Sequence, residues 1–329
     1  MGKIAIMANI LLNVENLTMH YTTRKGDVSA VDNVSFHLKE GESIGLVGES
    51  GCGKTSVALS LLKLLPDNAR IIDGHIWLND VDLVPLSEKE MNKIRWDRIS
   101  MVFQAAMNAL NPVYRVEDQI IEALEHCWGK VTKEQARERI AQLFEMVGLD
   151  PALMSRYPHE FSGGMRQRAI IAMALACNPD IIIADEPTTA LDVIVQDHIL
   201  QELRKVQHKL GMSMIYISHD IAVIAEVSDR IGVMYAGRMA EMAPALDIFK
   251  RPQHPYTVAL MSAFPSIKGE KTELVIVAGE PPDLLSPPSG CRFHPRCSYA
   301  TEICRQEQPP FENKGGEHYV ACWNPVEAN

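Results

Sequence analysis

The sequence predicts an α/β fold in which helices cover a largely parallel β-sheet. Strand and helix patterns alternate along residues 164–235, and such alternation is typical of parallel sheets. An apolar stretch at 44–47 also leads through a glycine-rich turn into a leucine-rich helical pattern at 57–65. With 329 residues, 47% of them hydrophobic, the chain can bury a large core and form more than one domain.

The elements are expected in the following order along the chain. Strands are predicted at 11–14, 17–21, 31–38, 44–47, 74–78, 181–184, 214–218 and 231–235. Helices are predicted at 57–65, 88–95, 117–128, 133–147, 164–177, 195–210 and 221–228. The segment at about 105–165 is therefore expected to be a helical insert in an α/β core.

Composition and charge exclude several classes of function. Acidic residues outnumber basic residues by 42 to 32, and the formal net charge of −10 argues against a nucleic-acid-binding surface. No apolar run approaches the roughly 20 residues that span a bilayer. The stretch 4–12 lacks a small-residue cleavage site, so we expect an N-terminal extension and first strand there, not a signal peptide. These features predict a soluble, cytoplasmic protein.

The turn after the strand at 44–47 carries a phosphate-binding loop. Residues 48–55, Gly-Glu-Ser-Gly-Cys-Gly-Lys-Thr, fit the pattern G-x-x-x-x-G-K-S/T. Its glycines let backbone N–H groups surround phosphate oxygens at a helix N-terminus. Lys54 is expected to reach the β- and γ-phosphates, and the Thr55 hydroxyl to ligate Mg²⁺. The residues predicted to bind ATP in this loop are Gly48, Ser50, Gly51, Cys52, Gly53, Lys54, Thr55 and Ser56.

Two carboxylates follow the apolar strand at 181–184. Asp185 can hold Mg²⁺ through water at the carboxyl end of the strand. Glu186 can orient and deprotonate the water that attacks the γ-phosphate. Acidic residues often end strands, so the pair alone is a weak indicator of a catalytic site. The phosphate loop upstream makes this interpretation strong.

Ser162, Gly163 and Gly164 open the helix at 164–177 and form a second anion cradle. Six motifs follow one another along the chain: the phosphate loop, Gln104, Ser162-Gly163-Gly164-Met165-Arg166-Gln167, Asp185-Glu186, Ala190-Leu191-Asp192 and Ser218-His219-Asp220. This order of motifs resembles that of the ATP-binding-cassette (ABC) family. Ala105-Ala106 departs from the Asp-Pro that many relatives have after the glutamine, which weakens the detailed contacts expected around Gln104.

The resemblance implies an ABC-type P-loop ATPase with a RecA-like core and a helical subdomain. Two cassettes would pair head to tail, with each ATP between the phosphate loop of one and Ser162, Gly163 and Gly164 of the other. His219 would contact the γ-phosphate and position the attacking water, and Gln104 would coordinate Mg²⁺. Tyr21 would stack on the adenine. The nucleotide-binding domain would span 1–250.

The resemblance extends to the ATPase subunits of dipeptide/oligopeptide transporters, a group that also handles nickel. It rests on Tyr157-Pro158-His159-Glu160, His254-Pro255-Tyr256-Thr257 and the segment 290–297. It implies two membrane permease subunits, a second ABC ATPase that is a sibling or an identical copy, an extracytoplasmic peptide-binding protein, and a place at the cytoplasmic face of the membrane. Alternatives are import of nickel or another solute, and a redox-responsive regulatory cassette. A cassette acting on DNA or ribosomes would need a basic surface, a second cassette or long coiled coils.

The composition changes near residue 250, which predicts a loop-rich appendage at 251–329. Eleven of the 19 prolines lie between Pro252 and Pro325, together with four of the seven cysteines. The four are Cys291, Cys297, Cys304 and Cys322, spaced C-x₅-C-x₆-C-x₁₇-C. Their gaps exceed those of structural zinc pairs and suit a larger cluster. Similar family members are associated with a 4Fe–4S cluster; Zn²⁺, or structural cysteines that are reduced or disulfide-bonded, are the alternatives.

Overall fold

The computed structural model describes residues 10–104, 109–188, 192–262 and 279–326. The chain divides into two compact units. We call Ile10–Leu38, Ile44–Val84 and Ser218–Asn329 the phosphate-loop unit, and Lys39–Ser43 with Pro85–Ile217 the signature unit. In the described ranges, no helix combines the length and the apolar character that crossing a bilayer requires.

The phosphate-loop unit contains an antiparallel sheet with the strand order β2-β1-β4-β5. These strands are β1 (Ile10–Thr23), β2 (Gly26–Lys39), β4 (Ala69–Leu78) and β5 (Val81–Asp82). The sequence predicted two short strands where β1 is one strand with register shifts between Glu15 and Met19. Gly74 of β4, at φ +95°, faces this bulge, because a Cβ there would come within 2.6 Å of the Glu15 and Asn16 carbonyl oxygens. The missing side chain allows the strand to continue through the bulge.

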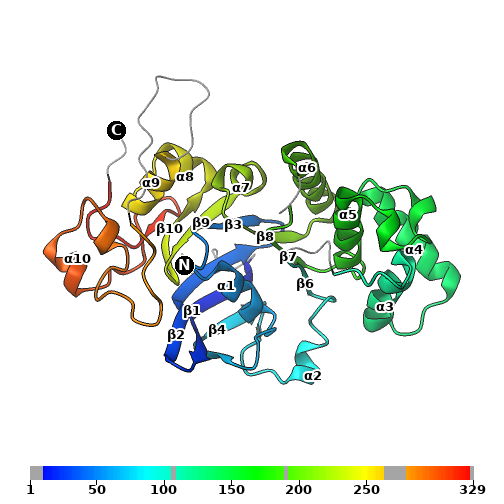
Figure 1. Ribbon diagram of the computed structural model, residues 1–329, viewed down its shortest axis with the longest axis horizontal. Coiled ribbons are helices and arrows are strands. Elements are labelled where there is room, and N and C mark those ends of the chain that lie inside the picture. Colours follow the sequence, from blue (N-terminus) through cyan, green and yellow to red (C-terminus); the bar gives the residue numbers. More distant parts are fainter. Residues whose placement is uncertain (1–9, 105–108, 189–191, 263–278, 327–329) are drawn as a thin grey trace, which may run out of the picture. The chain divides into compact units, whose positions relative to one another are not determined.

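A second set of strands in this unit carries the phosphate loop. β3 (Ser43–Val47) pairs in parallel with β9 (Arg230–Tyr235), and β9 pairs antiparallel with β10 (Arg238–Pro244). The C-terminal strands β12 (Tyr319–Val320) and β11 (Glu312–Asn313) extend the sheet beyond β10. Every residue of β3 and β9 is buried. The described segment 312–320 is thus built onto the sheet that holds the loop (Figure 1).

The helices of the phosphate-loop unit are short. They are α1 (Lys54–Leu61), α7 (Ile221–Val227), α8 (Ala245–Lys250), α9 (Pro255–Ser262), α10 (Glu302–Gln306) and the 3₁₀ turn His294–Arg296. Of these, α1 follows the phosphate loop directly, as the sequence predicted.

The signature unit contains parallel strands, of which the sequence predicted those at 181–184 and 214–218 but not the one at 99–102. β7 (Ile181–Asp185) pairs in parallel with both β6 (Ile99–Val102) and β8 (Ser213–Ser218). Its helices and 3₁₀ turns are α2 (Glu88–Met91), α3 (Val116–Trp128), α4 (Lys133–Met146), Pro151–Leu153, Pro158–Glu160, α5 (Gly163–Ala174) and α6 (Val193–Leu210). Helices α3, α4 and α5 pack on one another (Figure 1). The mixed α/β prediction is confirmed.

A disulfide joins Cys127, near the end of α3, to Cys177, which follows α5. No pairing of these two cysteines was predicted, because a sequence separation of 50 residues matches no local motif. The bond ties a helix of the insert to the helix that Ser162 begins.

Candidate functional site

The phosphate loop has the backbone that its glycines predict. Gly48 has φ +150°, and a Cβ there would lie 2.2 Å from the carbonyl oxygen of Met234. Gly53, the N-cap of α1, has φ +105°, and a Cβ there would lie 2.3 Å from the carbonyl oxygen of Ala30. A side chain at either position would collide with backbone atoms. Close packing against neighbouring strands therefore requires these two glycines.

The Lys54 side chain turns back over the loop. Its Nζ donates hydrogen bonds to the carbonyl oxygens of Gly48, at 2.7 Å, and Glu49, at 3.1 Å. The Lys54 ammonium group thus contacts the phosphate loop itself, whose backbone N–H groups are the expected phosphate ligands. Nearby, burial raises the pKa of the Cys52 thiol, which keeps it protonated at neutral pH. Cys52 is therefore a small packing residue in this loop.

The other predicted ligands of this unit lie around the loop and at a strand end. Ser50, Gly51 and Thr55 are exposed, whereas Ser56 is buried with its hydroxyl 3.2 Å from the Tyr21 hydroxyl. This hydrogen bond fixes the Tyr21 ring of β1 against the first turn of α1. The stacking of Tyr21 on adenine stays a prediction.

His219 is exposed and lies in the turn between β8 and α7, within the phosphate-loop unit. Asp220 caps α7 by accepting hydrogen bonds from the N–H groups of Ala222, at 3.0 Å, and Val223, at 3.3 Å. Its own N–H donates to the Ser218 hydroxyl at 3.0 Å. These bonds fix the backbone directly after His219, and the contact of His219 with a γ-phosphate stays a prediction.

The signature unit brings Gln104 and Glu186 together. Gln104 follows β6 and its Nε2 donates a hydrogen bond to Glu186 Oε2 at 2.8 Å. Glu186 has φ +46°, a conformation that costs a non-glycine residue energy, and its N–H donates to the carbonyl oxygen of Ile217 at 2.8 Å. Asp185 before it is buried at the end of β7. The strand end thus turns the Glu186 carboxylate away from the core.

Ser162 is the N-cap of α5, where its Oγ accepts a hydrogen bond from the N–H of Met165 at 3.3 Å. It is exposed, and the helix N–H groups of Gly163 and Gly164 follow it. A Cβ at Gly164 would approach Val195 Cγ1 to 3.1 Å, so packing against α6 favours a glycine here. The result is an accessible helix N-terminus of the kind that binds anions.

The four C-terminal cysteines line one small cavity with His254, Phe293 and Trp323. The backbone N–H of Cys291 donates to the carbonyl oxygen of Cys304 at 2.8 Å. Burial raises the pKa of Cys322 to about 12, and the three other thiols add to this rise. Across the part of the chain that is described, no three His, Cys, Asp or Glu side chains are arranged to hold a metal ion. The sequence thus predicted the clustering of these cysteines, but among the described residues the cysteines form no recognised metal-binding group.

Comparison with known proteins identifies the relatives of this chain. Residues 31–189 match the family model described as ABC transporter, and residues 240–304 match the oligopeptide/dipeptide transporter C-terminal region. The dipeptide transport ATP-binding protein DppD of Bacillus subtilis is 48% identical over 95% of this chain and 94% of its own length. The oligopeptide transport ATP-binding protein OppD of Salmonella typhimurium is 44% identical over 97% of this chain and 95% of its own length.

Solved structures agree with the sequence relatives. A dimer of the ATP-binding cassette MJ0796, in a post-hydrolysis state with ADP and Pi, has a TM-score of 0.64 and 29% identity. It covers 71% of this chain, and the match includes 98% of that cassette. The phosphate loop, the Glu186 strand end and the matched C-terminal region agree with these similarities, and the chain belongs to the family of ATP-binding subunits of dipeptide and oligopeptide ABC transporters.

Proposed function

We propose that the chain hydrolyses ATP and thereby powers the import of dipeptides and oligopeptides. The observation that carries this proposal is the Gln104–Glu186 contact, which holds a carboxylate at a strand end in a chain with an intact phosphate loop. Peptides are the favoured cargo because relatives at 48% and 44% identity are named for dipeptide and oligopeptide transport.

In this mechanism the loop N–H groups and Lys54 bind the ATP phosphates. Glu186 accepts a proton from water as the water oxygen bonds to the γ-phosphorus, and the bond to the β–γ bridging oxygen breaks. His219 contacts the γ-phosphate and holds the water in line. Ser162, Gly163 and Gly164 bind the γ-phosphate of an ATP held by a second cassette.

Magnesium fits the chemistry of its predicted ligands. Thr55 offers a hydroxyl oxygen and Asp185 a carboxylate, and Gln104 keeps its amide oxygen while its Nε2 donates to Glu186. Mg²⁺ prefers oxygen ligands of these kinds. When bound, the ion neutralises negative charge on the β- and γ-phosphates.

Further parts of the proposal concern partners and place. The chain pairs with a second ABC ATPase, either a sibling or a second copy, and docks on two permease subunits at the cytoplasmic face of the membrane. An extracytoplasmic binding protein delivers the peptide. Nucleic acid is not a partner, because the net charge of −10 opposes binding to a polyanion.

Reconstitution tests the cargo and the activity together. Vesicles that contain the permease subunits, the two ATPases and the binding protein should accumulate a labelled dipeptide only with Mg·ATP. Labelled nickel in the same vesicles tests the alternative solute. Uptake of nickel without uptake of peptide would show that nickel, not peptide, is the cargo. An assembly that leaves Mg·ATP uncleaved would refute the proposed ATPase activity.

We also propose that Cys291, Cys297, Cys304 and Cys322 hold a 4Fe–4S cluster. The support is that the four thiols line one cavity and that their spacing exceeds that of structural zinc pairs. Anaerobic purification followed by absorption spectroscopy and iron, sulfide and zinc analysis tests this. Cys304→Ser should lose the iron, and Cys127→Ser, outside the cavity, should keep it. Zinc in place of iron, or no metal with free thiols, would refute the cluster.

The cysteine cavity raises the alternative of a regulatory cassette. ATPase rate and dimerisation, measured with the four cysteines oxidised, reduced or replaced by serine, separate a structural from a regulatory role. Equal values in all three states would exclude regulation.

A further inference from the structure

The first variable residue of the phosphate loop, Glu49, is held by the C-terminal region. Arg296 meets its carboxylate with two hydrogen bonds, from Nη1 to Oε2 at 2.7 Å and from Nη2 to Oε1 at 2.9 Å. The Arg296 side chain is only 6% exposed. A two-pronged pair of this kind fixes orientation as well as distance, because both groups are planar. The Glu49 hydrogen bonds in turn raise the pKa of Arg296 above its usual value.

The backbone of Glu49 is held by the same region. Its N–H donates to the hydroxyl of Tyr256, at 3.0 Å, and Tyr256 is fully buried. The ring of Tyr256 packs on Tyr235, at 4.7 Å between centroids, and on Phe293, at 5.3 Å. The Tyr235 hydroxyl accepts a further hydrogen bond from Arg296 Nη1 at 3.2 Å. One aromatic cluster therefore fixes both partners of Glu49.

Glu49 passes this restraint to the groups that bind phosphate. Its carbonyl oxygen accepts hydrogen bonds from Lys54 Nζ, at 3.1 Å, and from the N–H of Cys52, at 3.2 Å. A shift of Glu49 therefore moves the lysine and the turn together. Preorganised loops bind more tightly, because less ordering remains to be done when the ligand arrives.

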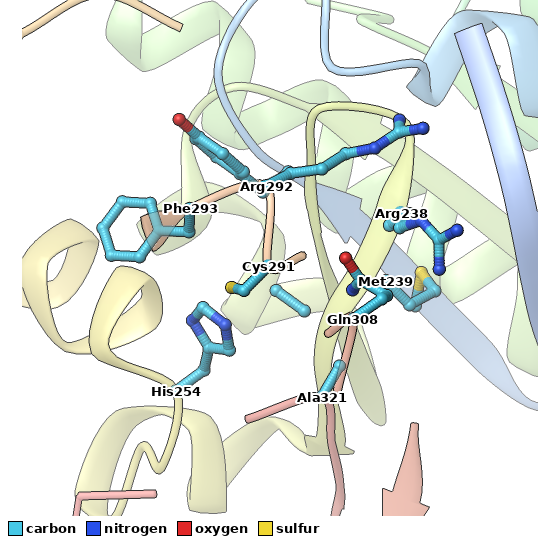
Figure 2. A pocket seen from close by; sticks show the side chains of 10 residues that line it. Arg238, Met239, His254, Cys291, Arg292, Phe293, Gln308 and Ala321 are labelled. Carbon is cyan, nitrogen blue, oxygen red and sulfur yellow. The ribbon is translucent and has the colours of Figure 1, made fainter. Parts of the chain in front are cut away.

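A second contact from the same segment reaches the far side of the loop. Arg292 donates to the Ala236 carbonyl oxygen and to the Asp32 carboxylate. Figure 2 shows Arg292 extending from beside Cys291 toward the turn between β9 and β10, near Arg238. In that turn the N–H of Gly237 donates to the Cys52 carbonyl oxygen at 2.9 Å. The segment 291–297 thus supports the loop at two points.

We propose that Arg296 and Tyr256 are positioning residues that hold the phosphate loop in its ATP-binding form through Glu49. The C-terminal region is then part of the nucleotide site and sets its affinity. The inference rests on the proposed function, since the ligand of the loop is ATP. A purely structural role makes a different prediction, because loss of the pair would lower stability and leave the ATP affinity of the folded protein unchanged.

The test compares variants of the full chain by equilibrium binding of a fluorescent ATP analogue. Arg296→Gln and Glu49→Gln should each weaken binding about tenfold, the effect of losing a charge-assisted hydrogen bond. The double variant should bind the ATP analogue no more weakly than either single variant, since all three lose the same interaction. Arg296→Lys should recover part of the affinity, because lysine keeps the charge and loses the fork.

Kinetics and controls complete the test. The KM for ATP should rise in Arg296→Gln while kcat at saturating ATP stays within about twofold, because positioning acts on binding. Lys314→Gln removes an exposed ion pair with Glu312 in the same region and should change neither constant. Tyr256→Phe removes one hydroxyl and keeps the ring. If Arg296→Gln does not fold, the ATP affinity of Tyr256→Phe tests the positioning role instead, and it should be weaker than that of the parent chain.

Two failures are distinguishable. A wild-type chain that does not bind the analogue would refute the proposed function. Wild-type affinity in folded Arg296→Gln and Tyr256→Phe, with binding intact in the parent chain, would refute the positioning role alone.

Discussion

Gln104 and Glu186 are joined by a hydrogen bond of 2.8 Å, although 82 residues separate them in the sequence. The amide of Gln104 fixes the position of the Oε2 atom of Glu186. Because Gln104 follows β6 and Glu186 follows β7, the pairing of these two parallel strands brings the two side chains together. This contact is the reason for proposing that Gln104 orients Glu186, and its amide oxygen remains the proposed metal ligand.

Replacing Glu186 with glutamine should remove the base and keep the shape of the side chain. We expect ATP binding to persist, kcat to fall by about 10²- to 10⁴-fold, and the nucleotide-bound dimer to accumulate. Steady-state ATPase assays and size-exclusion chromatography with Mg·ATP measure these effects. Glu122→Gln, an exposed position on α3, is the matched control and should retain full turnover. Normal hydrolysis by Glu186→Gln would place the base elsewhere.

Replacing Gln104 with alanine separates its two proposed roles. If the glutamine orients Glu186, kcat should fall by about tenfold or more even at saturating Mg²⁺, because misplacing a base slows proton transfer. If it acts only as a metal ligand, excess Mg²⁺ should restore the rate. ATPase activity measured against Mg²⁺ concentration distinguishes the two, and full recovery would rule out the orienting role.

Gly53 and Gly51 form a matched pair within the loop. Gly53→Ala places a Cβ 2.3 Å from a carbonyl oxygen, whereas Gly51→Ala meets no atom within 4 Å and has only an unfavourable φ of +78°. The strain at Gly51 amounts to roughly 1–2 kcal/mol, so ATP binding should weaken by about tenfold there. The ATP affinity of Gly53→Ala should fall by about 100-fold or more. Equal affinities in the two variants would contradict the packing at Ala30.

The sequence revealed the loop and the carboxylate pair because their chemistry is local. The glycine, lysine and threonine pattern identifies the loop, and the apolar run at 181–184 predicts a strand that is followed by two carboxylates. It could not reveal the partners of Glu49, because Arg296 lies 247 residues away and an arginine between cysteines has no marked pattern. The same holds for Cys127 and Cys177, which only the packing of α3 near the end of α5 brings together.

His75 and Asp82 form an exposed pair across the β4–β5 hairpin, with 2.7 Å between Nδ1 and Oδ2. The hydrogen bond to Asp82 raises the pKa of His75 above 6.5. The pair therefore stabilises the hairpin fully between about pH 4 and pH 6.5, where His75 is protonated and Asp82 is ionised. This contribution is lost as pH rises through the folded-state pKa of His75, and also in acid as Asp82 takes up a proton. NMR titration of labelled histidine should give a midpoint above 6.5, and Asp82→Asn should lower it. An unchanged midpoint in Asp82→Asn would contradict this interaction.

The Cys127–Cys177 disulfide should make the stability of the chain depend on reductant. Closing a loop with a sequence separation of 50 residues stabilises a protein by about 4 kcal/mol in the chain-entropy view, because the unfolded chain loses freedom. Cys177 is 6% exposed, so a reductant must reach the bond from the half-buried Cys127.

Urea unfolding with and without dithiothreitol measures this effect. The wild-type midpoint should fall in reductant, whereas Cys127→Ser/Cys177→Ser should start at the lower midpoint and stay there. This double variant leaves the C-terminal cysteines in place, so a fall of equal size in both proteins would assign the sensitivity to that cavity instead. Since the bond joins α3 to the segment after α5, its loss should also increase hydrogen exchange at the α5 N–H groups near Ser162, and unchanged exchange there would confine its influence to global stability.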